Sequence, residues 1–175
     1  MPADSDSVTP LGRFAAAWGL FGVALLLCSA VGRMAPPALE GMRSGMDAAH
    51  WTAFALVCLL MGYGMGCRGL VRSFAPRVAA RALHLLRAPT PVRAALAPFF
   101  CMSFFAAPAR RLRLSWGLTA TMIVLIVLVH GLRQPWHGIV DAGVCVGLFE
   151  GLAALAFHGV RDLLTGVPSR EPEVC

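Results

Sequence analysis

The sequence predicts an all-α protein, a polytopic transmembrane helix bundle with four spans, and three observations support this prediction. The 175-residue chain is 58% hydrophobic and only 14% charged, whereas soluble domains carry roughly 25% charged residues. Its apolar residues lie in four long runs, each close to the ~20 residues that cross a ~30 Å hydrocarbon core. All four tryptophans lie near the start of a run or just before one, where the amphipathic ring favours the membrane interface.

The four runs define the predicted organisation of the chain. A helix satisfies its backbone hydrogen bonds internally, which a segment inside lipid requires. The predicted spans cover residues 14–32, 48–67, 114–132 and 138–160, so the bundle extends over 14–160. An N-terminal tail over 1–13 precedes the bundle and a C-terminal tail over 161–175 follows it, and a long loop over 68–113 joins the second and third spans.

The first apolar run also has some features of a secretory signal peptide. Cys28, Ser29 and Ala30 form a poor cleavage site, however, and the residues before the run include Asp4 and Asp6. A signal peptide begins with a positively charged region. The run is therefore interpreted as a true span.

The distribution of arginine predicts the orientation. All 15 basic residues are arginine, and nine of them lie in the loop over 68–113, which has no acidic residue. Arginine near span ends favours the cytoplasmic side, so we expect this loop and both termini in the cytoplasm. The absence of lysine is typical of GC-rich bacterial genomes. We therefore expect an integral protein of the bacterial inner membrane.

One apolar stretch leaves the number of spans open. Residues 94–107 are apolar but are interrupted by Pro98, and runs of this length are more often interfacial, re-entrant or buried. If they crossed the membrane, the chain would have five spans and a nearly even division of arginines between the two sides. Four spans fit the length and the charge better.

The loop also contains a predicted basic amphipathic helix over residues 76–87. Proline at its start suits a helix N-terminus, and its basic and apolar residues fall on different faces. Such a helix lies on a leaflet surface and attracts anionic lipid headgroups. The candidate lipid contacts are Arg68, Arg72, Arg77, Arg81 and Arg87. No nucleic-acid-binding motif accompanies this charge, so the lipid bilayer is the expected partner and nucleic acid is not.

Two sets of glycines have the spacing of helix-packing faces. In lipid, small residues allow close backbone approach and therefore helix association. The second span carries Gly62, Gly66 and Gly69, and the fourth carries Gly143, Gly147 and Gly151, a pattern resembling a glycine zipper. We expect these two helices to pack, either against each other or across a homo-oligomer or another membrane subunit.

Two ionisable residues in the fourth predicted span are candidates for an ion or proton pathway. Glu150 borders the glycine face near mid-membrane, and His158 follows it by eight residues on much the same face. A charge at this depth costs ~2.5–3.5 kcal/mol on insertion scales and usually has a function. One alternative is therefore a small proton-coupled transporter or channel that uses Glu150. The other interpretation of Glu150 is a protonated carboxyl that only bonds a neighbouring helix.

The predicted outer ends of the spans carry several soft ligands. His50, His130 and His137 lie at span ends, and Met46 precedes His50 by one helical turn. Thioether and imidazole groups suit copper, and pairs of histidines hold haem in membrane cytochromes. A second alternative is therefore a copper- or haem-binding membrane protein.

No sequence pattern indicates an enzyme. The chain has no P-loop, no GxSxG, no HExxH and no dinucleotide-binding glycine pattern. The leading interpretation is a non-enzymatic interaction, assembly or transport-associated component of the membrane.

Overall fold

The computed structural model describes residues 9–105 and 108–171. The all-α prediction is confirmed for this part of the chain, which contains helices and no strand. The elements are α1 (Pro10–Arg43), α2 (Ala48–Met61), the π-helix η1 (Gly62–Phe74), α3 (Ala75–Arg87), α4 (Pro91–Ala95), α5 (Ala97–Cys101), α6 (Ala109–His130) and α7 (Trp136–Thr165).

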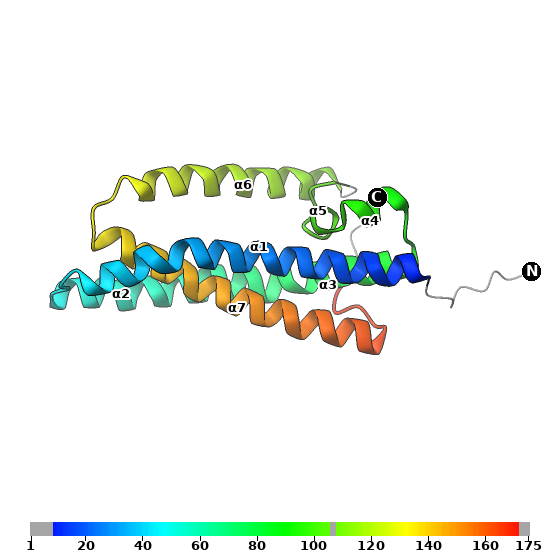
Figure 1. Cartoon of the computed structure of the whole chain (residues 1–175), viewed down its shortest axis with the longest axis horizontal. Helices are drawn as coiled ribbons and strands as arrows, with labels where there is room; N and C mark the ends of the chain where they lie inside the picture. The colour runs from blue at the N-terminus through cyan, green and yellow to red at the C-terminus, as the bar shows by residue number, and fades with distance from the viewer. Residues whose placement is uncertain (1–8, 106–107, 172–175) are drawn as a thin grey trace, which may run out of the picture.

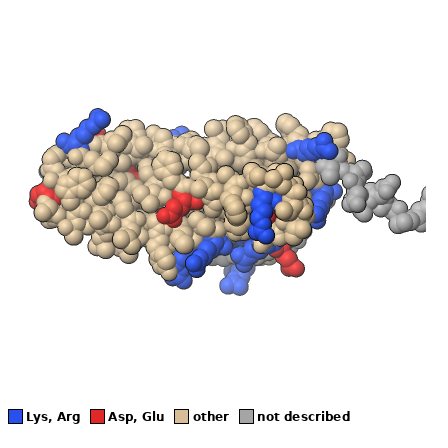
Figure 2. Space-filling view, turned by 90° about the horizontal axis from the view of Figure 1, so that it is seen from below, with Lys and Arg blue, Asp and Glu red and all other residues tan. Residues whose placement is uncertain are grey.

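The long helices lie roughly along one axis and run alternately in opposite directions (Figure 1). α1 begins at the end of the molecule where α3 and α7 finish, and α4 and α5 lie at this end too. We call it the arginine end, after Arg13, Arg81 and Arg87. The opposite end, where α2 and α7 begin, is called the histidine end, after His50 and His137. Figure 2 shows that most of the basic side chains on one face gather in the half that includes the arginine end.

Within the described residues, three helices are long and apolar enough to cross a membrane. They extend over Pro10–Arg43, Ala48–Arg87 and Trp136–Thr165. They include the predicted spans over 14–32, 48–67 and 138–160, and each extends beyond its predicted span. α6 is a helix as well, but its apolar part, Ser115–His130, is shorter than the other three. The structure therefore supports an integral membrane protein with three candidate spans.

The second long helix continues without a break through α2, η1 and α3. The amide of Ala75 donates to the carbonyl of Leu70, which is the i to i−5 pattern of a π-helix. This wider winding ends just before Pro76, whose nitrogen has no hydrogen to donate and whose ring would crowd the carbonyl of residue i−4 in an α-helix. The π-helix therefore provides a physical reason why the chain passes Pro76 as a helix.

The amphipathic segment over 76–87 is helical, as expected, but its expected position on the leaflet surface is wrong. α3 packs against α1 and α7, and Val78, Ala82 and Leu85 are buried in the core. The apolar face of this helix is covered by protein and not by lipid. An amphipathic pattern shows that one side of a helix is covered, but it does not show by what.

Residues 94–105 do not form a fifth span. α4 and α5 have five residues each, and they pack against the first half of α1. Ala97 and Phe100 are fully buried there. This apolar stretch is therefore a buried segment at the arginine end, one of the outcomes expected for a run of its length.

α7 is the central helix of the bundle and contacts α1, α2, η1 and α3. At its middle, glycines bring it against the second long helix. A Cβ placed on Gly147 would lie 3.3 Å from the amide nitrogen of Gly66, and one placed on Gly143 would lie 3.2 Å from the carbonyl oxygen of Val57. Gly151 lies against Leu70 of η1. The two glycine-bearing helices therefore pack against each other within one chain.

Gly69 does not belong to this contact. It is exposed, and a Cβ placed on it would meet only Gly64 of its own helix. Residues with the spacing of Gly62, Gly66 and Gly69 lie on one face only in an α-helix, which has about 3.6 residues per turn. In a π-helix, hydrogen bonds reach five residues ahead, so a turn holds more residues and Gly69 is rotated away. Its expected packing role is wrong for this reason.

A close backbone approach lies at the histidine end, between α1 and α7. A Cβ on Gly138 would lie 2.6 Å from the carbonyl oxygen of Pro37 and 2.7 Å from the Cα of Gly41. Gln134 joins the same two helices, because its side-chain amide donates to Pro37 O over 3.2 Å and accepts from the amide of Gly138 over 3.1 Å. Neither Gly41 nor Gly138 was recognised as a packing residue from the sequence.

Gly138→Ala should lower the free energy of unfolding by about 1–3 kcal/mol, the usual cost of overpacking, because both neighbouring groups are backbone and cannot rotate away. Gly117→Ala on α6 is the matched control, since nothing lies within 4 Å of the added Cβ there. Thermal or denaturant unfolding of the detergent-solubilised variants measures the difference. Equal stability of the two variants would contradict this contact.

Candidate functional site

The carboxyl of Glu150 lies in the space left by two glycines of the second long helix. A Cβ placed on Gly62 would lie 3.2 Å from Oε1 of Glu150, and one placed on Gly66 would lie 3.0 Å from its Cδ. The side chain is half-buried. Within the described residues no hydrogen bond or ion pair involves this carboxyl. Glu150 therefore rests against the backbone of η1, in the middle of two helices that are apolar enough to span a membrane.

The structure does not bring His158 to Glu150. The two residues are separated by about 12 Å along α7, at 1.5 Å per residue. His158 Nδ1 lies 3.1 Å from the hydroxyl of Ser169, in the segment that follows α7. The histidine is engaged at the arginine end, so the two residues do not form a direct proton path in this structure.

Asp162 anchors the segment that follows α7. It is fully buried, and Oδ2 accepts from the amide of Ser169 over 2.8 Å. Oδ1 accepts a hydrogen bond from the hydroxyl of the same serine. The turn that makes this possible is at Gly166, whose φ of 66° ends α7 in the left-handed conformation that glycine favours. Arg87 of α3 donates to the carbonyl of Gly166, so this turn also joins α3 to α7.

Asp162, Ser169 and His158 have the residue types of a hydrolytic triad, but their order is different. In such a triad the histidine lies between the serine and the aspartate, so that it can take the proton from the hydroxyl. Here Ser169 lies between the other two and donates to the carboxylate. A serine held in this way fixes the segment after α7 to the last turns of the helix. The arrangement does not support nucleophilic catalysis.

At the histidine end, two of the three histidines among the candidate metal ligands come together. The rings of His130 on α6 and His137 on α7 are 5.3 Å apart, and Nε2 of His137 lies 3.1 Å from Oδ2 of the buried Asp141. The i, i+4 spacing of His137 and Asp141 on one helix could have revealed this pair from the sequence. The contact between the rings of His130 and His137 links the last turn of α6 to α7.

His50 is arranged differently from the other two histidines. Its ring lies 5.2 Å from that of Trp136, and its Nδ1 lies 2.6 Å from Oδ1 of Asp47. Asp47 caps α2, and the hydrogen bond from the backbone amide of His50 holds the pKa of this carboxyl below its ordinary value. Met46 is half-buried just before the cap. Across the described part of the chain, no group of three or more His, Cys, Asp or Glu side chains is arranged to hold a metal ion.

Arg81 occupies a buried polar cluster at the arginine end. Its side chain is only 2% exposed. Its guanidinium donates to Ser103 Oγ over 3.2 Å and to Phe105 O over 3.1 Å, and it lies 4.3 Å from the ring centre of Phe100. The expected contact of Arg81 with lipid headgroups is therefore wrong, because the residue is inside the protein. Burial in the same cluster raises the pKa of the Cys101 thiol to about 12.

The other candidate lipid contacts are divided between exposed and engaged residues. Arg68 and Arg72 are exposed on η1. Arg77 is half-buried and donates to the carbonyl of Ser73 over 2.5 Å. Arg87 is exposed and also bonds Gly166. The arginines of one helix thus have different surroundings, which their common spacing in the sequence does not reveal.

Comparison with known proteins gives no family for this chain. No protein-family model matches it, and neither a curated protein nor a solved structure matches it. Its function has to be inferred from its own residues and their arrangement.

Proposed function

We propose that the chain is a non-enzymatic integral protein of the bacterial inner membrane, with both termini in the cytoplasm, that works by associating with a further transmembrane helix. In this proposal α6 crosses the membrane as a fourth span. The alternating direction of the four long helices supports it, since a fourth crossing returns α7 to the side where α1 begins. The arginine end is then the cytoplasmic end, in agreement with the usual excess of arginine on that side.

The exposure of α6 carries this proposal. Six consecutive residues, from Ile123 to Leu128, are all more than a third exposed. Successive residues of an α-helix are 100° apart, so six of them face every direction around the axis. This part of α6 is therefore not covered by this chain on any side.

The two ends of α6 are held in place, however. Near its beginning, Trp116 contacts Phe104 with a ring separation of 5.4 Å, and the hydroxyl of Ser115 donates to Met102 O over 3.4 Å. At its end, His130 contacts His137. Figure 1 shows α6 running alongside the other long helices between these points. An apolar helix that is fixed at both ends and uncovered between them presents its surface to lipid and to helices of other subunits.

Cysteine scanning of residues 123–128, in a chain whose own cysteines are replaced, tests this association. If α6 packs against α6 of a second copy, disulfide formation in native membranes should be strongest at two positions three or four residues apart, because one face of a helix repeats with that spacing. The corresponding exposed position Phe149 on α7 serves as control. If no position crosslinks and lipid-soluble reagents label all six equally, α6 faces lipid alone and the association with a second copy is wrong.

The position of Glu150 favours a second candidate function, proton or cation transfer through the bundle. A carboxyl in the middle of a span usually has a function. This one lies against a π-helix, a winding that is frequent at functional sites. The copper or haem alternative has weaker support, since His50 lies beside Trp136 and not beside the other two histidines.

Glu150→Gln tests this second function. The amide has nearly the same shape as the carboxyl, so the fold should be kept, whereas proton-driven flux in proteoliposomes should be lost because the amide cannot release a proton. Glu40→Gln on α1, where the residue is exposed, is the matched control and should behave as the unsubstituted chain. If Glu150→Gln retains full flux, Glu150 has no role as a proton carrier.

A further inference from the structure

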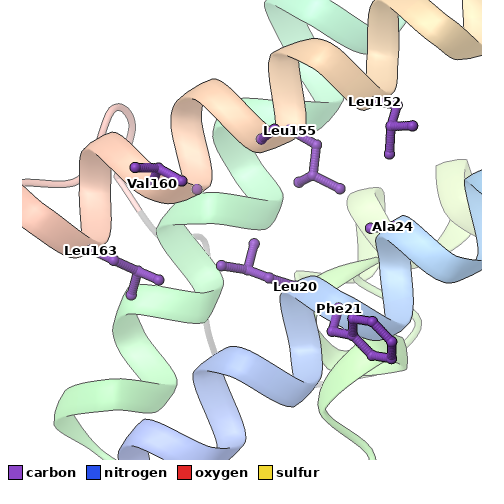
Figure 3. A pocket seen from close by; sticks show the side chains of 9 residues that line it. Leu20, Phe21, Ala24, Leu152, Leu155, Val160 and Leu163 are labelled. Carbon is purple, nitrogen blue, oxygen red and sulfur yellow. The ribbon is translucent and has the colours of Figure 1, made fainter.

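An apolar groove lies between α1 and α7 in the half of the molecule nearer the arginine end. It has a volume of about 210 Å³ and is lined entirely by apolar residues. Figure 3 shows Leu20, Phe21 and Ala24 of α1 on one side, and Leu155 and Val160 of α7 on the other. The groove is open to the outside of the bundle, on the surface of two helices that are candidate spans.

A second cavity continues this groove to the arginine end. Its volume is about 350 Å³, it is lined by Arg13, Leu86 and Leu163 among others, and Leu163 lines both cavities. On α1, the lining positions of the two cavities are 13, 16, 17, 20, 21 and 24. These positions form one stripe of a helix. The two cavities share Leu163 and therefore adjoin each other along α1.

The dimensions of the groove match one leaflet of a bilayer. From Arg13 to Ala24 the helix rises about 17 Å, at 1.5 Å per residue. Half of a ~30 Å hydrocarbon core is about 15 Å. A transmembrane helix, which is about 10–12 Å across, would lie over this open groove and not within it. A single acyl chain is much narrower.

The charge of the groove matches an anionic headgroup. Arg13 is exposed at its mouth, directly before the first predicted span. Among the described residues, no hydrogen bond or ion pair engages its guanidinium. Arginine binds phosphate through two parallel hydrogen bonds. Basic pockets between transmembrane helices on the cytoplasmic side are also a known setting for anionic lipid headgroups.

We propose that this groove binds one anionic phospholipid of the membrane, with its phosphate at Arg13 and one acyl chain along the apolar stripe of α1. This binding site rests on the proposed insertion of the chain in a membrane. It is distinct from the contacts predicted for the arginines of η1 and α3, which lie on other helices. The lipid would fill the space between α1 and α7 at the arginine end, where Gly159 already allows Leu20 to approach α7 closely.

Native mass spectrometry of the full-length protein in detergent tests the site with two probes, phosphatidylglycerol and phosphatidylcholine carrying the same acyl chains. We expect one bound lipid and a preference for phosphatidylglycerol of about fivefold, the effect of roughly one arginine near a headgroup. Arg13→Gln should abolish the preference. Arg110→Gln on α6 is its control and should keep it.

Ala156→Phe tests the acyl-chain part of the groove, because Ala156 lines it. This variant should bind both lipids at least about tenfold more weakly, since the ring occupies the cavity. Ala153→Phe is the matched control, because Ala153 is exposed on α7 but does not line the groove. Circular dichroism establishes that each variant keeps its helical content.

Three results would overturn the proposal. The first is equal binding of the two lipids by the unsubstituted chain, and the second is lipid binding that neither Arg13→Gln nor Ala156→Phe changes. The third is a dimer that Ala156→Phe disrupts, which would make the groove a contact between copies. Extraction of membranes with alkaline carbonate separates these failures from failure of the proposed function: if the chain stays in the membrane but binds no lipid at the groove, only the lipid site is wrong.

Discussion

Close backbone contact between α7 and its two long neighbours is the constraint on which the rest of the structure depends. Helices in lipid gain little from burying apolar surface, because the lipid tails are equally apolar, so association depends on how closely the backbones approach. α7 meets α1 at Gly41 and Gly138, and it meets the second long helix at Gly66 and Gly147. These contacts fix α7 at the centre of the bundle and hold Glu150 against η1.

The packing of the helices determines which partners the buried polar groups have. Near the ends of the long helices, several buried polar side chains have partners, as shown by Asp141 with His137 and by Asp162 with Ser169. Arg81 is likewise held by Ser103 and by the face of Phe100. Unpaired buried polar groups are costly, so these contacts stabilise the two ends. Glu150 differs from them, since it lies far from either end and no described residue bonds it, and this difference makes it the strongest candidate for a chemical role.

The sequence was a good guide to the long apolar helices and a poor guide to what covers them. Hydropathy located the parts of α1, α2 and α7 that resemble spans, because lipid and a protein core select the same residues. It could not show that α3 faces protein, since an amphipathic face looks the same when it is covered by headgroups. The glycines of α7 were found from their regular spacing, whereas Gly41 lies outside the four apolar runs. The packing role of Gly69 was wrongly predicted because no sequence pattern indicated the π-helix.

The candidate sites, too, could be predicted from the sequence only in part. His137 and Asp141 could have been paired from their spacing on one helix, and Glu150 was recognisable as a carboxyl in an apolar run. The buried position of Arg81 could not be predicted, because five arginines of similar spacing differ only in what the fold places beside them. The hydrogen bonds between Asp162 and Ser169 depend on the chain reversing at Gly166. The groove beside Arg13 exists only once α1 and α7 are packed together.

The most direct test of the central claim is disulfide formation between Gly62→Cys and Val146→Cys, in a chain without its own cysteines and in native membranes. A Cβ at Gly62 lies 3.3 Å from Cγ1 of Val146, and a disulfide joins Cβ atoms about 3.5–4.5 Å apart. We expect a crosslink within one chain, and no crosslink for the control pair of Gly62→Cys and Phe149→Cys, because Phe149 is exposed. A crosslinked dimer, or no crosslink at all, would contradict the packing of α7 against the second long helix within one chain.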